Sequence, residues 1–235
     1  MKQLIIASTS TIHNSDYLEY ILNDLSLLFN NITSILFIPY ARPSGITHTQ
    51  YTKTVSTAFA KINKTVIGIH TFKNPAEAIK NAQAIFVGGG NTFVLTHQLY
   101  KNNLLAILKT KIETGTPYLG TSAGSNICGL TIKTTNDMPI IYPPSFNALG
   151  IVPFNINPHY IDPNPKSKHM GETRETRIKE FHHYNTQPVI GLREGSWLSV
   201  KGSTITLKGK LSARIFEYNK PPYEIASGTE ISYLN

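Results

Sequence analysis

The sequence predicts an α/β fold, in which a mostly parallel β-sheet carries helices on both faces. Over residues 1–130, short apolar runs alternate with segments of helical periodicity, as in successive βαβ units. The apolar runs are almost uninterrupted, which is typical of strands buried on both faces of a parallel sheet. Residues 188–209 instead alternate apolar and polar positions between glycine-containing turns, which predicts β-hairpins at the C-terminal end.

The first two predicted strands flank a helix. The apolar run QLIIAS predicts a strand over 3–8, and apolar residues at intervals of three and four predict a helix over 15–30. Ser15 precedes an acidic first turn, where a helix-capping residue belongs. The run SILFIPY predicts the next strand over 34–40, followed by a helix over about 48–63.

The next elements continue the alternation. KTVIGIHTF predicts a strand over 64–72, and the Asn-Pro pair at 74 and 75 is typical of the start of a helix, here 74–82. QAIFVGGG predicts a buried strand over 83–90 that ends in three glycines. A helix over about 91–114 and a short strand, PYLG at 117–120, complete the series.

The composition changes after residue 130. A segment rich in Pro, Asn and Thr predicts loops with short strands, and long loops in compact domains are often functional. A polar helix is expected over about 172–184, before the predicted hairpins. Because we find no internal repeat, low-complexity tract or linker, we expect one domain over 1–235.

Composition restricts the class of protein. The 235 residues are 40% hydrophobic, enough for a full core, and the net charge is +8. The basic residues are scattered rather than clustered, so we expect anionic small molecules rather than nucleic acid as partners. No apolar run is long enough for a membrane span or a signal peptide. With the single Cys128, this predicts a cytoplasmic protein, and the sequence leaves a homodimer open.

Residues 120–124, GTSAG, form the pattern G-x-S-x-G. In hydrolases this pattern places a nucleophilic serine on a sharp turn between a strand and a helix, where small neighbours let the backbone turn tightly. Ser122 is therefore a candidate nucleophile. Serine is also a common helix cap, so the pattern alone leaves a structural role open.

The glycines of GGGN follow the strand before PYLG, and the carboxyl ends of parallel strands meet at one edge of a sheet. Backbone N–H groups can approach a ligand closely at glycine. The N–H groups of Ala123 and of Gly89 or Gly90 are therefore candidates for an oxyanion hole. GGGNT matches neither the dinucleotide-binding nor the Walker pattern of a phosphate loop, and a plain tight turn is the alternative.

His159, in INPHY, lies where a short apolar run meets a proline-rich loop, and is the candidate general base. We expect His182 and His183 on an exposed helix surface. Either Asp137 or Glu194 could serve as the acid that orients the base, and turn chemistry alone could explain both residues. Asp162 is a third, weaker candidate acid.

GETRETR places Glu172, Arg174 and Arg177 together at the start of a predicted helix. They are either a solvated helix start or a clamp for an anionic group of a substrate, because arginine offers a planar fork to carboxylates. Cys128 is expected to be a small buried residue. No spacing of His, Cys or carboxylate residues indicates a metal site, so we expect no metal and no cofactor.

Several segments in order resemble the peptidase E family of α-aspartyl dipeptidases, which are serine hydrolases. They cover roughly residues 34–200 and include FVGGGNTFVL, YLGTSAGSN, TIKTTNDMPI, FNINPHY, GETRETRIKEF and VIGLREGSW. The resemblance implies a flavodoxin-like or class I glutamine amidotransferase-like fold without a metal. It also implies hydrolysis of small peptides, namely dipeptides with N-terminal L-aspartate.

Carried onto this sequence, the resemblance implies Ser122 as nucleophile and His159 as base. Asp137 matches the aspartate usually assigned to the charge relay, and Glu194 matches a glutamate that can be proposed instead. Arg174 matches the arginine expected to bind the aspartyl carboxylate, with Glu172 beside it. The chain departs mildly from the common pattern at Thr121, where Trp can occur, and at Ser125, where Ala is usual.

Two other functions stay open on the sequence. A cyanophycinase-like hydrolase would share the fold and the serine turn but would act on β-aspartyl peptides. A binding module of the same fold would lack catalysis, and its Ser122 would not react with a serine-directed probe. An amidotransferase is not expected, because that chemistry uses Cys at the position of Ser122.

Overall fold

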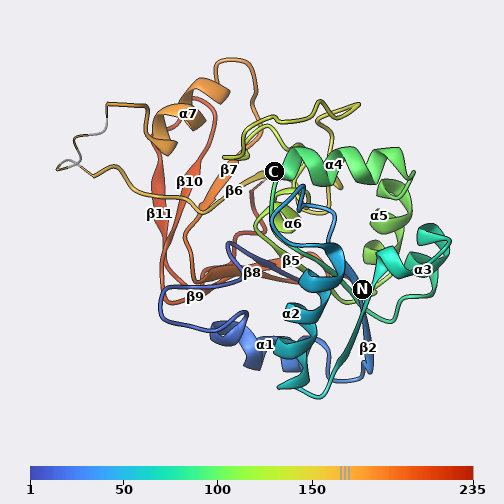
Figure 1. Ribbon diagram of the computed structural model, residues 1–235. Coiled ribbons are helices and arrows are strands. Elements are labelled where there is room, and N and C mark those ends of the chain that lie inside the picture. Colours follow the sequence, from blue (N-terminus) through green and yellow to red (C-terminus); the bar gives the residue numbers. More distant parts are fainter. Residues whose placement is uncertain (165, 167, 169, 235) are drawn as a thin grey trace.

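A seven-stranded sheet lies at the centre of the computed structural model, which describes residues 1–164, 166, 168 and 170–234 (Figure 1). The strand order is β3-β2-β4-β5-β1-β8-β9. The strands are β1 (Gln3–Ala7), β2 (Ser34–Ile38), β3 (Thr65–Gly68), β4 (Ile85–Val87), β5 (Tyr118–Thr121), β8 (Ser196–Lys201) and β9 (Thr204–Gly209). The first five run parallel, whereas β8 is antiparallel to both of its neighbours. The predicted α/β fold with a mostly parallel sheet is confirmed.

Helices cover both faces of this sheet. They are α1 (Leu22–Leu28), α2 (His48–Ala60), α3 (Pro75–Asn81), α4 (Thr92–Lys101), α5 (Leu105–Glu113) and α6 (Ala123–Asn126), with 3-10 turns at Glu19–Ile21 and Ile69–Thr71. Alternate residues of β1 pack against the helices on the two faces, because successive side chains of a strand point in opposite directions. Ile5 packs in one buried cluster with α1 and α2, and Ile6 packs in the other with α3, α4 and α5.

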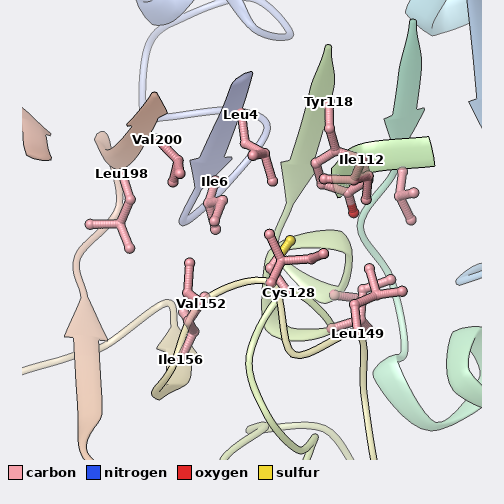
Figure 2. Packing of buried hydrophobic residues seen from close by; sticks show 14 of the residues in the cluster. Leu4, Ile6, Ile112, Tyr118, Cys128, Leu149, Val152, Ile156, Leu198 and Val200 are labelled. Atoms are coloured by element: carbon pink, nitrogen blue, oxygen red, sulfur yellow. The ribbon is translucent and has the colours of Figure 1, made fainter. Parts of the chain in front are cut away.

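A second, four-stranded sheet has the order β11-β10-β7-β6. Its strands are β6 (Asn155–Pro158), β7 (Val189–Leu192), β10 (Ala213–Phe216) and β11 (Tyr223–Ile225). Helix α7 (Arg174–Phe181) packs on this sheet through Ile178. Figure 2 shows Ile156 of β6 and Val152 facing Ile6 and Leu198 of the main sheet, so the two sheets share one core.

The structure differs from the predicted elements at three places. The helix expected over 91–114 is two helices, because Asn103 adopts a left-handed conformation (φ 55°) between them. The helix expected over 15–30 is α-helical only from Leu22, and Ser15 bonds with Glu19 instead of capping it. Strand β7 joins the second sheet rather than pairing with β8. By contrast, Asn74 caps α3 as predicted.

The carboxyl ends of β4, β5 and β1 meet at one edge of the main sheet. The second sheet approaches the same edge, since the N–H of His159, just after β6, donates a hydrogen bond to Ser8, just after β1. The short connection between β7 and β8 crosses from one sheet to the other here and contains Glu194. This edge therefore gathers segments from distant parts of the chain.

No helix in the described part of the chain is both long enough and apolar enough to span a membrane.

Candidate active site

Ser122 lies on a sharp turn between β5 and α6. Its backbone has φ 53° and ψ −110°, a conformation that costs a non-glycine residue about 1–3 kcal/mol and persists only where the surroundings enforce it. The N–H of Ser122 donates to Ala7 O (3.1 Å), which ties the turn to β1. The buried hydroxyl of Ser125, where the resemblance implies alanine, lies 2.6 Å from Ala7 O and 2.8 Å from Gly120 O, which adds a second link between the turn and β1.

Ser122, His159 and Glu194 form a continuous chain of hydrogen bonds. Ser122 Oγ lies 2.9 Å from His159 Nε2, and His159 Nδ1 lies 2.6 Å from Glu194 Oε1. Because an ionised carboxylate only accepts hydrogen bonds, Nδ1 is the protonated nitrogen and donates to Glu194. In a neutral imidazole this leaves Nε2 free to accept from the serine hydroxyl, which is the arrangement that a general base requires.

The parallel register of β6 and β7 brings the histidine and the glutamate together. Pro158 of β6 pairs with Leu192 of β7, so the residues directly after these two strands leave the sheet side by side. His159 has φ 54°, a left-handed conformation, and its N–H donates to Ser8 Oγ at 2.9 Å. Ser8 Oγ in turn donates to Leu192 O at 2.7 Å, which links the base to the strand before the acid.

Sequence reasoning did not single out Ser8 or Asn136, although both form hydrogen bonds at His159 or at the residue before it. The Asn136 side-chain amide donates to Pro158 O at 2.6 Å, next to His159. Ser8 is fully buried and lies at the carboxyl end of β1. Its place at the end of a parallel strand is the one feature of the sequence that could have indicated it.

The other two candidate acids make different contacts. Asp137 Oδ2 accepts hydrogen bonds from the N–H of Thr92 (2.7 Å) and from the hydroxyl of Thr135 (3.0 Å). Asp162 forms a two-point ion pair with Arg193, at 2.6 and 2.8 Å. Of the three acids that the sequence left open, Glu194 is the one hydrogen-bonded to the histidine ring in the described part of the chain.

The glycine loop after β4 lies against the serine turn. A Cβ atom on Gly89 would lie 3.0 Å from the Cβ of Ser122, closer than real side chains allow without a shift. Gly90 has φ 145° and lies against the carbonyl of Ala41, so only glycine fits there. The N–H groups of Gly89, Gly90 and Ala123 take part in none of the loop and turn hydrogen bonds of the described chain.

Glu172, Arg174 and Arg177 line a cavity of about 450 Å³ at the start of α7. The side chain of Thr173 caps this helix by accepting from the N–H of Thr176. Arg174 is half-buried, and it makes no hydrogen bond or ion pair to any residue of the described chain. Burial and the neighbouring Arg177 lower the pKa of its guanidinium, an effect that Asp137 opposes. An unpaired, partly desolvated cation is suited to bind an anion.

Cys128 is buried, as the sequence predicts, and burial raises the pKa of its thiol to about 12. Among the residues that the structure describes, no three His, Cys, Asp or Glu side chains are placed to share a metal ion.

Comparison with known proteins shows the family to which the chain belongs. A profile of Peptidase family S51 matches residues 4–208. The chain is 45% identical to Peptidase E of Streptomyces coelicolor, over 98% of this chain and 94% of that protein. It is 44% identical to a Drosophila melanogaster protein named "Probable alpha-aspartyl dipeptidase", over 99% of this chain and 97% of that protein.

The fold agrees as well. A crystal structure of a peptidase from an acI-B1 actinobacterium superposes with a TM-score of 0.73, covering 98% of this chain and 96% of that one at 17% identity. The family profile covers most of the chain, and both curated relatives match it over nearly its whole length. The chain therefore belongs to peptidase family S51.

Proposed function

We propose that this peptidase is a serine-type dipeptidase that hydrolyses dipeptides with an N-terminal L-aspartate. The observation that carries the proposal is the hydrogen-bond chain from Ser122 through His159 to Glu194, built on a strained serine turn. The substrate class is suggested by the name alpha-aspartyl dipeptidase of the Drosophila relative and by the unpaired Arg174 near the site.

The first half of the reaction forms an aspartyl ester on the enzyme. His159 Nε2 accepts the proton of Ser122 as the serine oxygen attacks the carbonyl carbon of the Asp–X bond. Glu194 holds the imidazole in the required tautomer and stabilises the imidazolium that forms. His159 then gives the proton to the leaving nitrogen as the C–N bond breaks, and the free amino acid departs.

The second half releases aspartate. A water molecule attacks the ester carbonyl while His159 accepts its proton, and the same proton returns to the serine oxygen as the C–O bond breaks. In both halves the carbonyl oxygen becomes negative. The N–H of Ala123 and that of Gly89 or Gly90 stabilise this charge, an effect worth about 3–4 kcal/mol for one such donor.

Arg174 binds the side-chain carboxylate of the substrate through its planar guanidinium. A glutamyl side chain would carry its carboxylate one methylene further, past this group, so Asp-X is preferred over Glu-X. We place the reaction in the cytoplasm, since a single buried cysteine suits a reducing compartment.

The decisive experiment measures hydrolysis of Asp-Leu, Glu-Leu and β-Asp-Leu by the wild type and by Ser122→Ala. We expect cleavage of Asp-Leu alone, abolished in the variant. Cleavage restricted to β-Asp-Leu would replace the proposal with a β-aspartyl hydrolase. No cleavage of any of the three by the folded wild type, with no reaction of Ser122 with a fluorophosphonate probe, would indicate a binding protein.

Arg174 is tested with Arg174→Gln, which keeps a polar, though shorter, side chain and removes the charge. We expect kcat/KM for Asp-Leu to fall by about 10- to 100-fold, the usual value of a charge-assisted hydrogen bond. Hydrolysis of Asn-Leu, which lacks the charge on the side chain, should change little. An equal loss of kcat/KM on both substrates would show that Arg174 does not bind the side-chain carboxylate.

A further inference from the structure

We propose that Asp137 binds the α-ammonium group of the substrate and thereby restricts the enzyme to aspartate at the N-terminus of a peptide. This inference rests on the proposed function, because it assigns a binding residue to the ammonium group of the same substrate aspartyl residue whose carboxylate Arg174 binds. It gives Asp137 a role in recognition, and leaves the orientation of His159 to Glu194.

The segment that carries Asp137 bridges the glycine loop and the histidine. On one side, the Asp137 carboxylate accepts the N–H of Thr92, and the Asn91 side chain donates to Met138 O at 2.9 Å. On the other side, Asn136 donates to Pro158 O, the residue before His159. Gly89 and the histidine ring each contact Ser122, so Asp137 lies between two elements that flank the nucleophile.

One oxygen of the carboxylate is fixed and the other is available. Both hydrogen bonds to the side chain, from Thr92 and Thr135, end on Oδ2. Within the described residues Oδ1 accepts no hydrogen bond, and the side chain is half-buried rather than fully enclosed. Asp137 is thus held at the N-terminus of α4 with a second acceptor oxygen left for a cationic ligand.

The histidine has no position left for Asp137. Its Nε2 is next to Ser122 Oγ and its Nδ1 is next to Glu194 Oε1, so both ring nitrogens have partners. An acid that orients a catalytic histidine does so through the nitrogen that faces away from the nucleophile. In this arrangement Glu194 occupies that position, so Asp137 does not orient the imidazole by a direct hydrogen bond.

The charges near Asp137 match those of an N-terminal aspartyl residue. Such a residue carries an ammonium group on its α-carbon and a carboxylate one carbon further. Arg174 offers a cation for the carboxylate, and the negative charge of Asp137 acts to raise the pKa of its guanidinium. An aspartate inside a longer chain has an uncharged peptide nitrogen, and would leave the Asp137 charge without its counterpart.

Glu172 is the competing acid for the ammonium group. It lines the same cavity as Arg174 and is exposed. Asp137 is fixed by two hydrogen bonds, so little side-chain freedom is lost when it binds a ligand, whereas an exposed glutamate must be ordered first. This difference favours Asp137, and the experiment below includes both residues.

The test compares Asp-Leu with succinyl-Leu, which keeps the side-chain carboxylate and the scissile bond but lacks the ammonium group. The quantity measured is the ratio of kcat/KM for Asp-Leu to that for succinyl-Leu. We expect Asp137→Asn to lower this ratio by about 10- to 100-fold, the value of a charge-assisted hydrogen bond, mainly through KM for Asp-Leu. The intrinsic reactivity difference between the substrates cancels when variants are compared.

Glu194→Gln and Glu172→Gln are the matched controls, and both should keep the wild-type ratio. The same comparison can be made without catalysis, by measuring Kd of the two compounds for Ser122→Ala and for Ser122→Ala with Asp137→Asn. This second readout keeps the test decisive if Asp137→Asn is inactive.

Two results would overturn the inference. An equal loss on both substrates in Asp137→Asn would assign Asp137 to the orientation of His159 or to the local structure. If Glu172→Gln instead lowered the ratio of kcat/KM for Asp-Leu to that for succinyl-Leu, Glu172 would be the residue that binds the ammonium group. Failure of the proposed function is distinguishable from both, because the wild type would then not cleave Asp-Leu.

Discussion

Nδ1 of His159 and Oε1 of Glu194 lie 2.6 Å apart, although 35 residues separate them in the chain. They meet because β6 and β7 are parallel neighbours whose last residues are paired. Ser122 lies on the other side of the same imidazole ring. The imidazole of His159 is therefore held between a residue of the main sheet edge and a residue at the junction of the two sheets.

Replacing Glu194 with Gln should lower kcat by roughly 10³- to 10⁴-fold, with a small change in KM. The amide can donate a hydrogen bond to Nδ1 and so favour the wrong tautomer of His159, as the corresponding change does in serine proteases. Steady-state kinetics on Asp-Leu measures the effect. The matched variant Asp162→Asn removes an acid that does not contact the ring, and a comparable loss there would contradict the assignment.

Ser8→Ala should lower kcat by about 10- to 100-fold while the protein stays folded. The change leaves the N–H of His159 without its acceptor and frees a residue in a left-handed conformation, so the imidazole loses its alignment with Ser122. Kinetics and thermal unfolding are measured together. The control is Ser15→Ala, at a half-buried serine whose hydroxyl donates to Glu19, and equal activity in the two variants would refute the role of Ser8.

Cys128 should resist alkylation by iodoacetamide in the native protein at pH 8. Burial raises the pKa of its thiol to about 12, so the reactive thiolate is absent over the working range of pH, and the sulfur is shielded from the reagent. Mass spectrometry of native and urea-denatured samples checks this. Modification is expected only after denaturation, and rapid labelling of the native protein would show that the site opens.

Glu224→Gln should make the free energy of unfolding less dependent on pH in acid. Hydrogen bonds from Arg193 lower the pKa of the Glu224 carboxyl from 4.5 to about 2. A carboxyl with a lowered folded-state pKa stabilises the protein above about pH 4.5, and this contribution disappears as pH falls towards 2. The free energy of unfolding should therefore fall more steeply over this range in the wild type than in the variant.

Urea denaturation at pH 7, 4.5 and 3 provides the comparison for Glu224→Gln. Parallel pH dependence in the two proteins would contradict the ion pair. Arg193 also binds Asp162, three residues after His159, and directly precedes Glu194. Activity measured in the same samples will show whether the contact between His159 and Glu194 is lost at a higher pH than the fold.

Most of the fold could be predicted from the sequence, because the alternation of apolar strands with amphipathic helices reflects local periodicity. The break at Asn103 was missed because apolar residues continue at helical spacing on both sides of it, while Leu104 beyond it is fully buried. Strand β7 was placed among hairpins because its sequence resembles that of β8. The choice of partner strand depends on which faces the rest of the chain leaves uncovered.

The sequence by itself determined the serine turn, the candidate base, the charged helix start and the family resemblance, since these depend on short motifs in order. The tertiary structure decided which acid meets His159, that Ser8 and Asn136 support it, and that Asp137 binds at the start of α4 instead. These contacts join residues that are far apart in the chain. They depend on the pairing of β6 with β7 and on the approach of the two sheets, which no local pattern encodes.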